Sequence, residues 1–291
     1  MKRRDFISNT SGLALAASCL PSVLNAAEEE PRFQMALSQY SLRALLKDGS
    51  LKAIDFPKYS VDTFGIKAID LWEGGLPKDK LDDNAYLESM KKAAEKANTD
   101  LFLLMTGTLQ SAPKLADKSI EKITISLDRA QRLGCRYLRI FLMAKNEEEA
   151  IAALQKLCDN AAKRKIKIII EPTPRGKGRE GVFLAAIHQK LKHPNLTLMP
   201  DFGKLKGNIY TGTEAMLPFS ESISAKMHSF NKEGKQPDFD YDRLAKMIVA
   251  SKYKGYIAIE WEGRALKPVE GVKASQKLII ESFAKHGAKV I

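Results

Sequence analysis

The chain has 291 residues, a formal net charge of +12 and 44% hydrophobic residues, which suits one large globular domain. No stretch reaches the roughly 20 apolar residues of a membrane span, so none is expected. The lysines are spread along the expected helices without interleaved aromatic residues, and nucleic-acid binding is therefore not indicated.

The first residues, 1–27, have the pattern of an export signal: a basic start, a modest apolar run and a small-residue exit. The pair Arg3-Arg4, with Phe6 close behind, resembles a twin-arginine signal, and a general secretory signal is the alternative. We therefore predict passage through the twin-arginine export machinery and a periplasmic or otherwise exported protein. Cys19 follows a poor lipidation motif, and its lipid attachment is left open.

The rest of the chain, 28–291, alternates apolar, strand-like runs with helical patterns. Four of the expected helices cover 83–98, 147–165, 241–251 and 269–287. The expected strands cover 33–39, 66–72, 100–106, 136–142, 165–171, 196–202, 224–230 and 256–261. Eight such strands in one domain indicate a (β/α)8 TIM barrel of the α/β class. An open doubly wound sheet is the rival, but no glycine-rich phosphate turn follows the first strand.

Two cysteines lie within the barrel, Cys135 and Cys158. They fall on consecutive elements and read as buried apolar side chains more than as a disulfide. No Cys-x-x-Cys motif is present, so cysteine-based zinc or redox chemistry is not indicated.

The last four expected strands each deliver a metal-ligand type of side chain at the C-terminal end: Glu171, Asp201, His228 and Glu260. Active sites of TIM barrels lie at this face, and neighbouring strands are about 4.8 Å apart, so the four side chains can converge on one ion. Three carboxylates and one imidazole favour Mn²⁺, with Mg²⁺, Co²⁺ or Zn²⁺ as alternatives.

Further polar and aromatic side chains flank these strand ends and are candidates for binding the substrate. They are Lys204, Lys226, Arg175, Glu73, Trp72 and Trp261. Each has an ordinary alternative, as a solvated surface group or a packing residue. Glu262 lies two residues beyond Glu260 and so on the same side of the strand, where it would support a ligand.

The motifs IIIEPTP, MPDFGKL, SAKMHSFN and IAIEWEG, taken in succession, resemble the sugar phosphate isomerase/epimerase superfamily of xylose-isomerase-like barrels. The early segment 37–72 is similar to exported members of that superfamily. The resemblance implies one divalent metal bound by Glu171, Asp201, His228 and Glu260. It also implies that Glu171 and Glu260 are the catalytic acid/base pair. Lys204 stands where the ketose epimerases of the superfamily carry a histidine, which argues against a free ketose as substrate.

The expected function is a metal-dependent isomerase or epimerase on a sugar or sugar derivative, since a metal acidifies the C–H next to a carbonyl and a carboxylate removes the proton. A lyase or hydratase on 3-keto-glycosides or related keto compounds would use the same site. A sugar-binding barrel without activity is a third alternative. A nuclease of the superfamily would need a histidine-rich metal cluster, and the chain has four histidines. An oligomer is left open.

Overall fold

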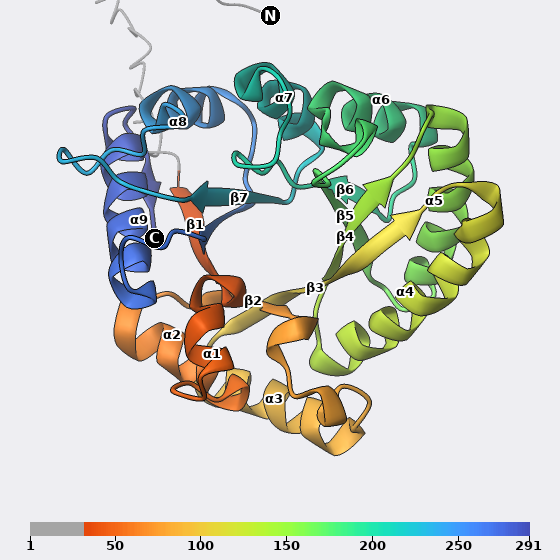
Figure 1. Cartoon of the computed structure of the whole chain (residues 1–291), viewed down its shortest axis with the longest axis horizontal. Helices are drawn as coiled ribbons and strands as arrows, with labels where there is room; N and C mark the ends of the chain where they lie inside the picture. The colour runs from red at the N-terminus through yellow and green to blue at the C-terminus, as the bar shows by residue number, and fades with distance from the viewer. Residues whose placement is uncertain (1–31) are drawn as a thin grey trace, which may run out of the picture.

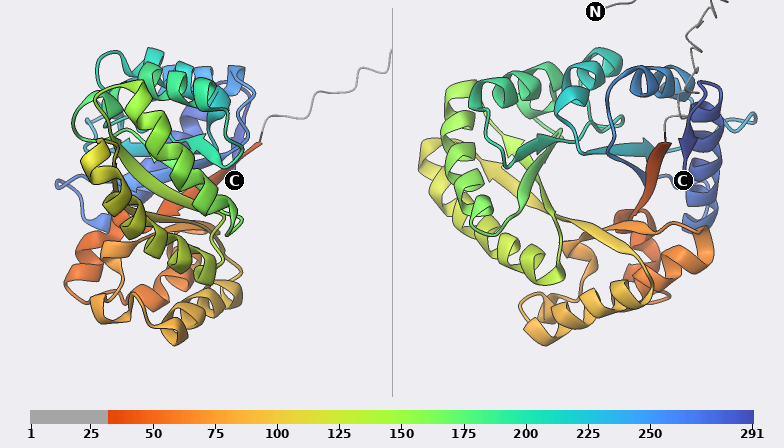
Figure 2. Two further views of the ribbon diagram at one scale, coloured as in Figure 1. Left: turned by 90° about the vertical axis from the view of Figure 1, so that its right-hand side faces the viewer. Right: turned by 180° about the vertical axis from the view of Figure 1, so that it is seen from behind.

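A ring of helices encloses a ring of strands in the computed structural model, which describes residues 32–291 (Figure 1). Figure 2 shows the same arrangement from the side and from behind. Helical segments follow each of the eight barrel strands along the chain. The fold is therefore the single-domain (β/α)8 barrel that the sequence predicts. The predicted export signal, residues 1–27, and Cys19 lie outside the described residues.

The strands within the described part of the chain are β1 (Arg32–Ser38), β2 (Ala68–Trp72), β3 (Asp100–Gln110), β4 (Tyr137–Met143), β5 (Lys167–Glu171), β6 (Leu196–Leu198), β7 (Ser222–Met227), β8 (Tyr256–Trp261) and a short β9 (Lys289–Val290). The α-helices are α1 (Arg43–Lys47), α2 (Phe56–Phe64), α3 (Asn84–Lys96), α4 (Pro113–Leu133), α5 (Glu147–Ala162), α6 (Gly181–Leu191), α7 (Ile209–Met216), α8 (Tyr241–Ala250) and α9 (Pro268–Ala284). None of these helices is long and apolar enough to cross a membrane.

The sheet has the strand order β6-β5-β4-β3-β2-β1-β8-β7, and β9 pairs with β1. All of these pairs are parallel. Two single bridges, Leu198 to Ser220 and Asp201 to Ser224, join the β6 side to the β7 side. The register places Lys226 of β7 directly beside Glu260 of β8. This pairing brings opposite charges together at the end of the barrel.

Side chains along a strand alternate between two environments, because successive residues point to opposite faces. On β8, Ile257, Ile259 and Trp261 belong to the large apolar cluster between strands and helices, whereas Ala258 belongs to a small cluster inside the barrel. Glu260 continues the alternation of Ala258 and faces the interior. The same alternation places a charged residue of several other strands inside the barrel.

Two strands end three or four residues earlier than predicted. β7 ends at Met227, where the sequence suggested 230, so His228 lies just beyond the strand. β6 ends at Leu198, where the sequence suggested 202, because Pro200 has no N–H to continue the ladder. β3 runs on to Gln110, four residues past the predicted end. The two cysteines, Cys135 and Cys158, are buried and free, as predicted.

Capping side chains fix where the predicted helices begin. Asp83 accepts hydrogen bonds from the backbone N–H groups of Ala85 and Tyr86 at the start of α3. Asn146 accepts from the N–H of Glu149 at the start of α5, whose first turn holds three glutamates. These helices hold the connected strands at fixed depth, and so they fix the positions of the side chains at the strand ends.

Candidate active site

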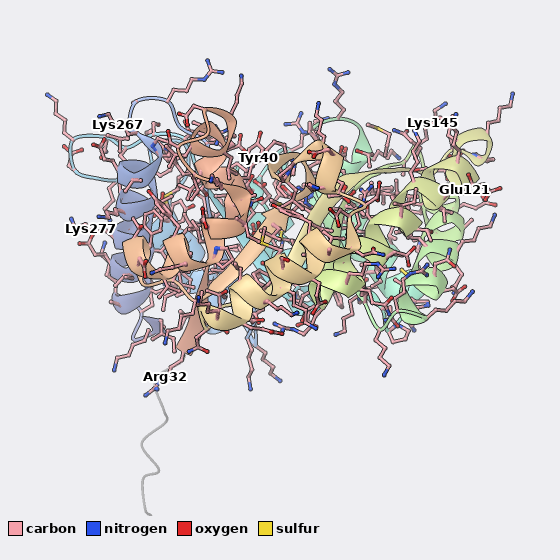
Figure 3. All side chains as sticks on the ribbon, turned by 90° about the horizontal axis from the view of Figure 1, so that it is seen from below. Arg32, Tyr40, Glu121, Lys145, Lys267 and Lys277 are labelled. Atoms are coloured by element: carbon pink, nitrogen blue, oxygen red, sulfur yellow. The ribbon has the colours of Figure 1, made fainter. Side chains whose placement is uncertain are left out.

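The C-terminal ends of the strands share one face of the barrel. In Figure 3, Arg32 at the start of β1 lies at one end, whereas Tyr40, Lys145 and Lys267, which follow β1, β4 and β8, lie at the other. A cavity of about 750 Å³ lies at the end of the barrel where the strands begin, and a cavity of about 590 Å³ lies at the mouth where the strands end. Trp72, lysine and glutamate side chains line the mouth cavity.

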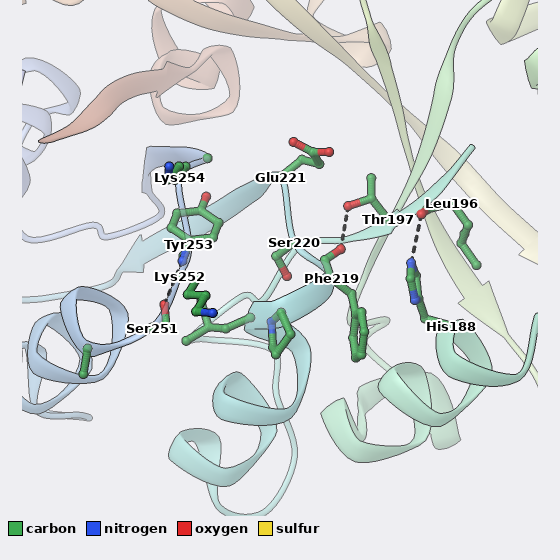
Figure 4. A pocket seen from close by; sticks show the side chains of 14 residues that line it. His188, Leu196, Thr197, Phe219, Ser220, Glu221, Ser251, Lys252, Tyr253 and Lys254 are labelled. Atoms are coloured by element: carbon green, nitrogen blue, oxygen red, sulfur yellow. Dashed lines mark hydrogen bonds between the residues drawn. The ribbon is translucent and has the colours of Figure 1, made fainter. Parts of the chain in front are cut away.

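In the cavity where the strands begin, polar side chains are already paired with neighbouring backbone groups (Figure 4). The His188 ring nitrogen pairs with the backbone oxygen of Leu196 at 3.0 Å, and the same ring stacks on Phe219. The Thr197 hydroxyl donates to the backbone oxygen of Phe219 at 2.6 Å. These polar groups serve the local backbone. Because active sites of this fold lie at the C-terminal face, we place the candidate site at the mouth cavity.

Three carboxylates meet at the mouth: Glu171 at the end of β5, Asp201 after β6 and Glu260 on β8. Each offers an oxygen, and these oxygens lie within 4.8 Å of one another. All three side chains are buried. By the type and spacing of its oxygens, this acidic triad could bind a metal ion. His228 is not part of the group; its Nε2 atom lies close to Gly203 instead.

Lys226 lies among the carboxylates with only 1% of its surface exposed. Its Nζ atom is 3.1 Å from Asp201 Oδ2 and 3.0 Å from Glu260 Oε1, and it also pairs with Glu262. Burial alone lowers the pKa of Lys226, but Asp201 and Glu260 outweigh it and hold that pKa well above its usual range. The side chain is therefore a buried, permanent cation.

Lys204 and Arg139 supply two further positive charges. The Lys204 ammonium pairs with Glu171 and lies 3.4 Å from Asp201 Oδ2 and 4.8 Å from the centre of the Phe141 ring. Arg139 Nε lies 2.8 Å from Glu171 Oε2, without the alignment of a hydrogen bond. Three cationic side chains thus face the three carboxylates.

The pKa values of Glu171 and Glu260 are shifted in opposite directions. Burial raises the pKa of Glu171 to about 7, although Lys204 and Arg139 oppose the shift. The pKa of Glu260 is instead lowered, because Lys226 and Lys204 and a hydrogen bond from Ser224 outweigh its burial. Near neutral pH, Glu260 is therefore ionised, whereas Glu171 is close to the midpoint between its protonated and ionised forms. Such divergence within a pair is typical of acid/base sites.

The structure separates the other predicted residues into two groups. Lys204, Glu73, Trp72 and Glu262 line the mouth cavity. Glu73 accepts one hydrogen bond on each carboxylate oxygen, from Arg129 and from Thr106, which hold the side chain in place.

The second group lies away from the cavity. Trp261 is 1% exposed, stacks on Phe230 and packs in the core, so the structure gives it a packing position. Arg175 is exposed on the loop after β5 and does not line the cavity.

Sequence reasoning did not select Arg139 or Asp70, both buried charged residues within strands. Burial raises the pKa of Asp70 well above its usual range, and the nearby Glu260 adds to the shift. The signal was present in the sequence: each interrupts an apolar strand at a position that faces the barrel interior. The apolar neighbours of such a residue pack outward, which leaves the charged one inside.

With Lys204 and Lys226 in their present positions, this site fits a metal ion poorly. Asp201 Oδ2 and Glu171 Oε2 accept no aligned hydrogen bond, which leaves lone pairs for a cation. Yet Lys226 and Lys204 already stand within 3.4 Å of Asp201 Oδ2. A divalent ion on the triad would be held against two ammonium groups, so no step below passes through a metal.

Comparison with solved structures agrees with the barrel fold. A zinc-bound IolI protein has a TM-score of 0.69 at 14% identity, covering 87% of this chain and 99% of its own. The apo 3-keto-D-glucoside 4-epimerase of E. coli has a TM-score of 0.65 at 11% identity, covering 85% and 98%. At such identities these likenesses show the fold alone.

Sequence comparison adds a curated relative and a family. A segment of 70 residues is 29% identical to the α subunit of a C-glycoside deglycosidase from Arthrobacter globiformis, over 22% of this chain and 20% of the relative's length. The family model of the xylose isomerase-like TIM barrel matches residues 60–282. The chain therefore belongs to the xylose isomerase-like TIM barrel family.

Proposed function

We propose that this protein isomerises or epimerises a sugar or sugar derivative by moving a proton at the carbon next to a carbonyl group. One observation carries the proposal: Glu260 and Lys204 line the mouth cavity, and the buried carboxylate of Glu171 lies behind them, paired with Lys204 and with an oxygen within 4.8 Å of one of Glu260. Carboxylate bases beside a fixed positive charge are what such a proton transfer requires.

The roles follow from the charges. Removal of a proton next to a carbonyl leaves negative charge on the carbonyl oxygen, and a nearby cation stabilises it. Lys204 lines the cavity and is placed to give this charge. Glu260, kept ionised, accepts a proton; Glu171, with a pKa of about 7, both accepts and returns one near neutral pH.

The site offers two sources for the cation. One is a divalent ion on Glu171, Asp201 and Glu260, for which the sequence favours Mn²⁺; the fourth ligand that the sequence predicts, His228, lies outside this group. When bound, such an ion polarises a carbonyl oxygen. The other source is the chain's own lysines, which already contact the same carboxylates.

The cavity suits a small carbohydrate. Its volume of about 590 Å³ is within the usual range for small-molecule sites. Trp72 and Tyr40 form one wall, with ring centres 4.8 Å apart. The epimerase with the same fold acts, by its name, on a 3-keto-D-glucoside. A keto-glycoside is therefore the first substrate to test.

Lyase or hydratase activity on a 3-keto-glycoside is the second candidate, favoured by the local likeness to the C-glycoside deglycosidase subunit. Both reactions begin with the same proton abstraction. They differ in the product: isomerisation conserves the mass of the substrate, whereas elimination releases the substituent. Mass spectrometry of the products distinguishes them.

Incubation with keto-sugars and 3-keto-glycosides in D₂O tests the proposal. We expect wild-type protein to introduce deuterium next to the carbonyl of at least one compound, as followed by NMR. Glu171→Gln and Glu260→Gln should slow this exchange by about 10²–10⁴-fold. Exchange that is equal in both variants and in wild type would refute the assigned roles. No exchange with any compound would favour a sugar-binding barrel without activity.

A further inference from the structure

Lys226 occupies the centre of the carboxylate cluster. Three carboxylates from two segments converge on its ammonium: Asp201 after β6, and Glu260 and Glu262 at the end of β8 and directly beyond it. The side chain is almost completely buried. A buried charge is tolerated only when it is paired and hydrogen-bonded, and Lys226 meets that condition through three acidic partners.

The surrounding chain makes room for this lysine. A Cβ atom on Gly203 would lie 2.5 Å from Lys226 Cδ and 3.0 Å from Cγ, so any other residue at 203 would press on the lysine stem. Glu260 is oriented from its other side, where its Oε2 atom accepts a hydrogen bond of 2.7 Å from Ser224 Oγ. The position of the ammonium is thus built by neighbouring residues.

We infer that the Lys226 ammonium, held by Asp201 and Glu260 of the acidic triad and by Glu262, is the resident cation of this site, and that the site assembles without a metal. Its meaning for catalysis rests on the proposed function, but the identity of the cation can be tested separately. Lys226 is a positioning residue: it holds Asp201, Glu260 and Glu262, while Lys204 presents positive charge to the cavity.

Competition between the two cations favours the lysine. Metal–oxygen bonds are about 2.0–2.3 Å, so an ion on Asp201 Oδ2 or Glu260 Oε1 would lie within about 5 Å of the ammonium. Like charges at this distance in a buried site repel strongly. The lysine is part of the chain and loses no translational freedom on pairing, whereas a free ion does.

The test is a comparison of metal binding in three proteins: wild type, Lys226→Ala and the control Lys167→Ala. The control removes a lysine that also pairs with a glutamate, Glu221 at 2.8 Å, but at the opposite end of β5. Each protein is exposed to EDTA or Mn²⁺, freed of unbound ion, and analysed for bound manganese and for its melting temperature.

We expect wild type and the control to hold well below one ion per chain and to melt at the same temperature in EDTA and Mn²⁺. Lys226→Ala, with its triad exposed to the ion, should bind Mn²⁺ in a saturable way. Its melting temperature should rise by about 5–10 °C at a hundredfold excess over Kd. This gain of a metal response is not expected of a lysine with a purely structural role.

One tightly held ion per wild-type chain would overturn the inference, and so would a folded Lys226→Ala variant that ignores Mn²⁺. If Lys226→Ala does not fold in either buffer, the manganese content of the wild type decides alone. Failure of the proposed function looks different. In that case the metal-binding experiments support Lys226 as the cation, but no compound exchanges deuterium. If instead a compound exchanges deuterium and the wild type holds one ion per chain, the proposed function stands and the assignment of Lys226 is wrong.

Discussion

Replacement of Lys226 by methionine removes a buried charge and keeps most of the side-chain volume. Two unit charges 3.0 Å apart, the Lys226–Glu260 separation, interact by about 5 kcal/mol at an effective dielectric constant of roughly 20. Part of this energy offsets the desolvation of the charges. Breaking a buried pair by removing one partner nevertheless costs about 3–5 kcal/mol, because the remaining carboxylates lose their counter-charge.

For a domain of this size we therefore expect Lys226→Met to lower the melting temperature by about 6–20 °C. Calorimetry in EDTA, with matched urea denaturation, measures the change. Lys167→Met is the control: its ion pair with Glu221 is partly exposed, with side-chain exposures of 42% and 36%, and should contribute at most about 1 kcal/mol. Adding Glu260→Gln to Lys226→Met should recover part of the loss. A Lys226→Met loss no larger than the control's would refute the electrostatic account of the site.

Three further predictions concern the acidic residues and the export signal. The pKa of Glu171, raised to about 7, lets the folded protein keep a proton that the unfolded chain loses near pH 4.3. The free energy of unfolding of the wild type should therefore fall by up to about 4 kcal/mol as pH rises through this window. Urea denaturation at about pH 5 and about pH 8 measures this change. The free energy of unfolding should fall between the two pH values in the wild type but not in Glu171→Gln. Glu260→Gln should reduce deuterium exchange by about 10²–10⁴-fold and Glu262→Gln by less, and the reverse order would show that Glu262 is the functional carboxylate. Replacing Arg3 and Arg4 by lysine should leave the protein in the cytoplasm in cell fractionation, whereas continued export would indicate a general secretory signal.

The sequence was sufficient to predict the barrel and all three members of the acidic triad. Apolar runs between helical patterns locate parallel strands, and parallel strands in this fold bring their C-terminal ends to one face. Glu171, Asp201 and Glu260 therefore come together as the strand-end rule implies. The rule does not predict how far along its strand each side chain lies.

Depth is what separates Lys226 from His228. Both positions have the same parity in the predicted strand 224–230, which would place both side chains on the interior side, but the strand ends three residues earlier than predicted. In the structure the strand ends at Met227, and the lysine, one step deeper, reaches the carboxylates. Arg139 shows a related gap: its contact with Glu171 depends on the neighbouring strand and on side-chain length, which a single sequence does not specify.

The most direct test of this account is deuterium exchange by metal-free wild-type protein. Protein treated with EDTA, its manganese and zinc content verified, is incubated in D₂O with the compound that shows exchange in the initial panel. We predict that the rate equals that of untreated protein, does not rise when Mn²⁺ is added, and is lost in Glu171→Gln. Exchange that disappears with EDTA and returns with Mn²⁺ would contradict the central claim that lysine side chains supply the cation at this site.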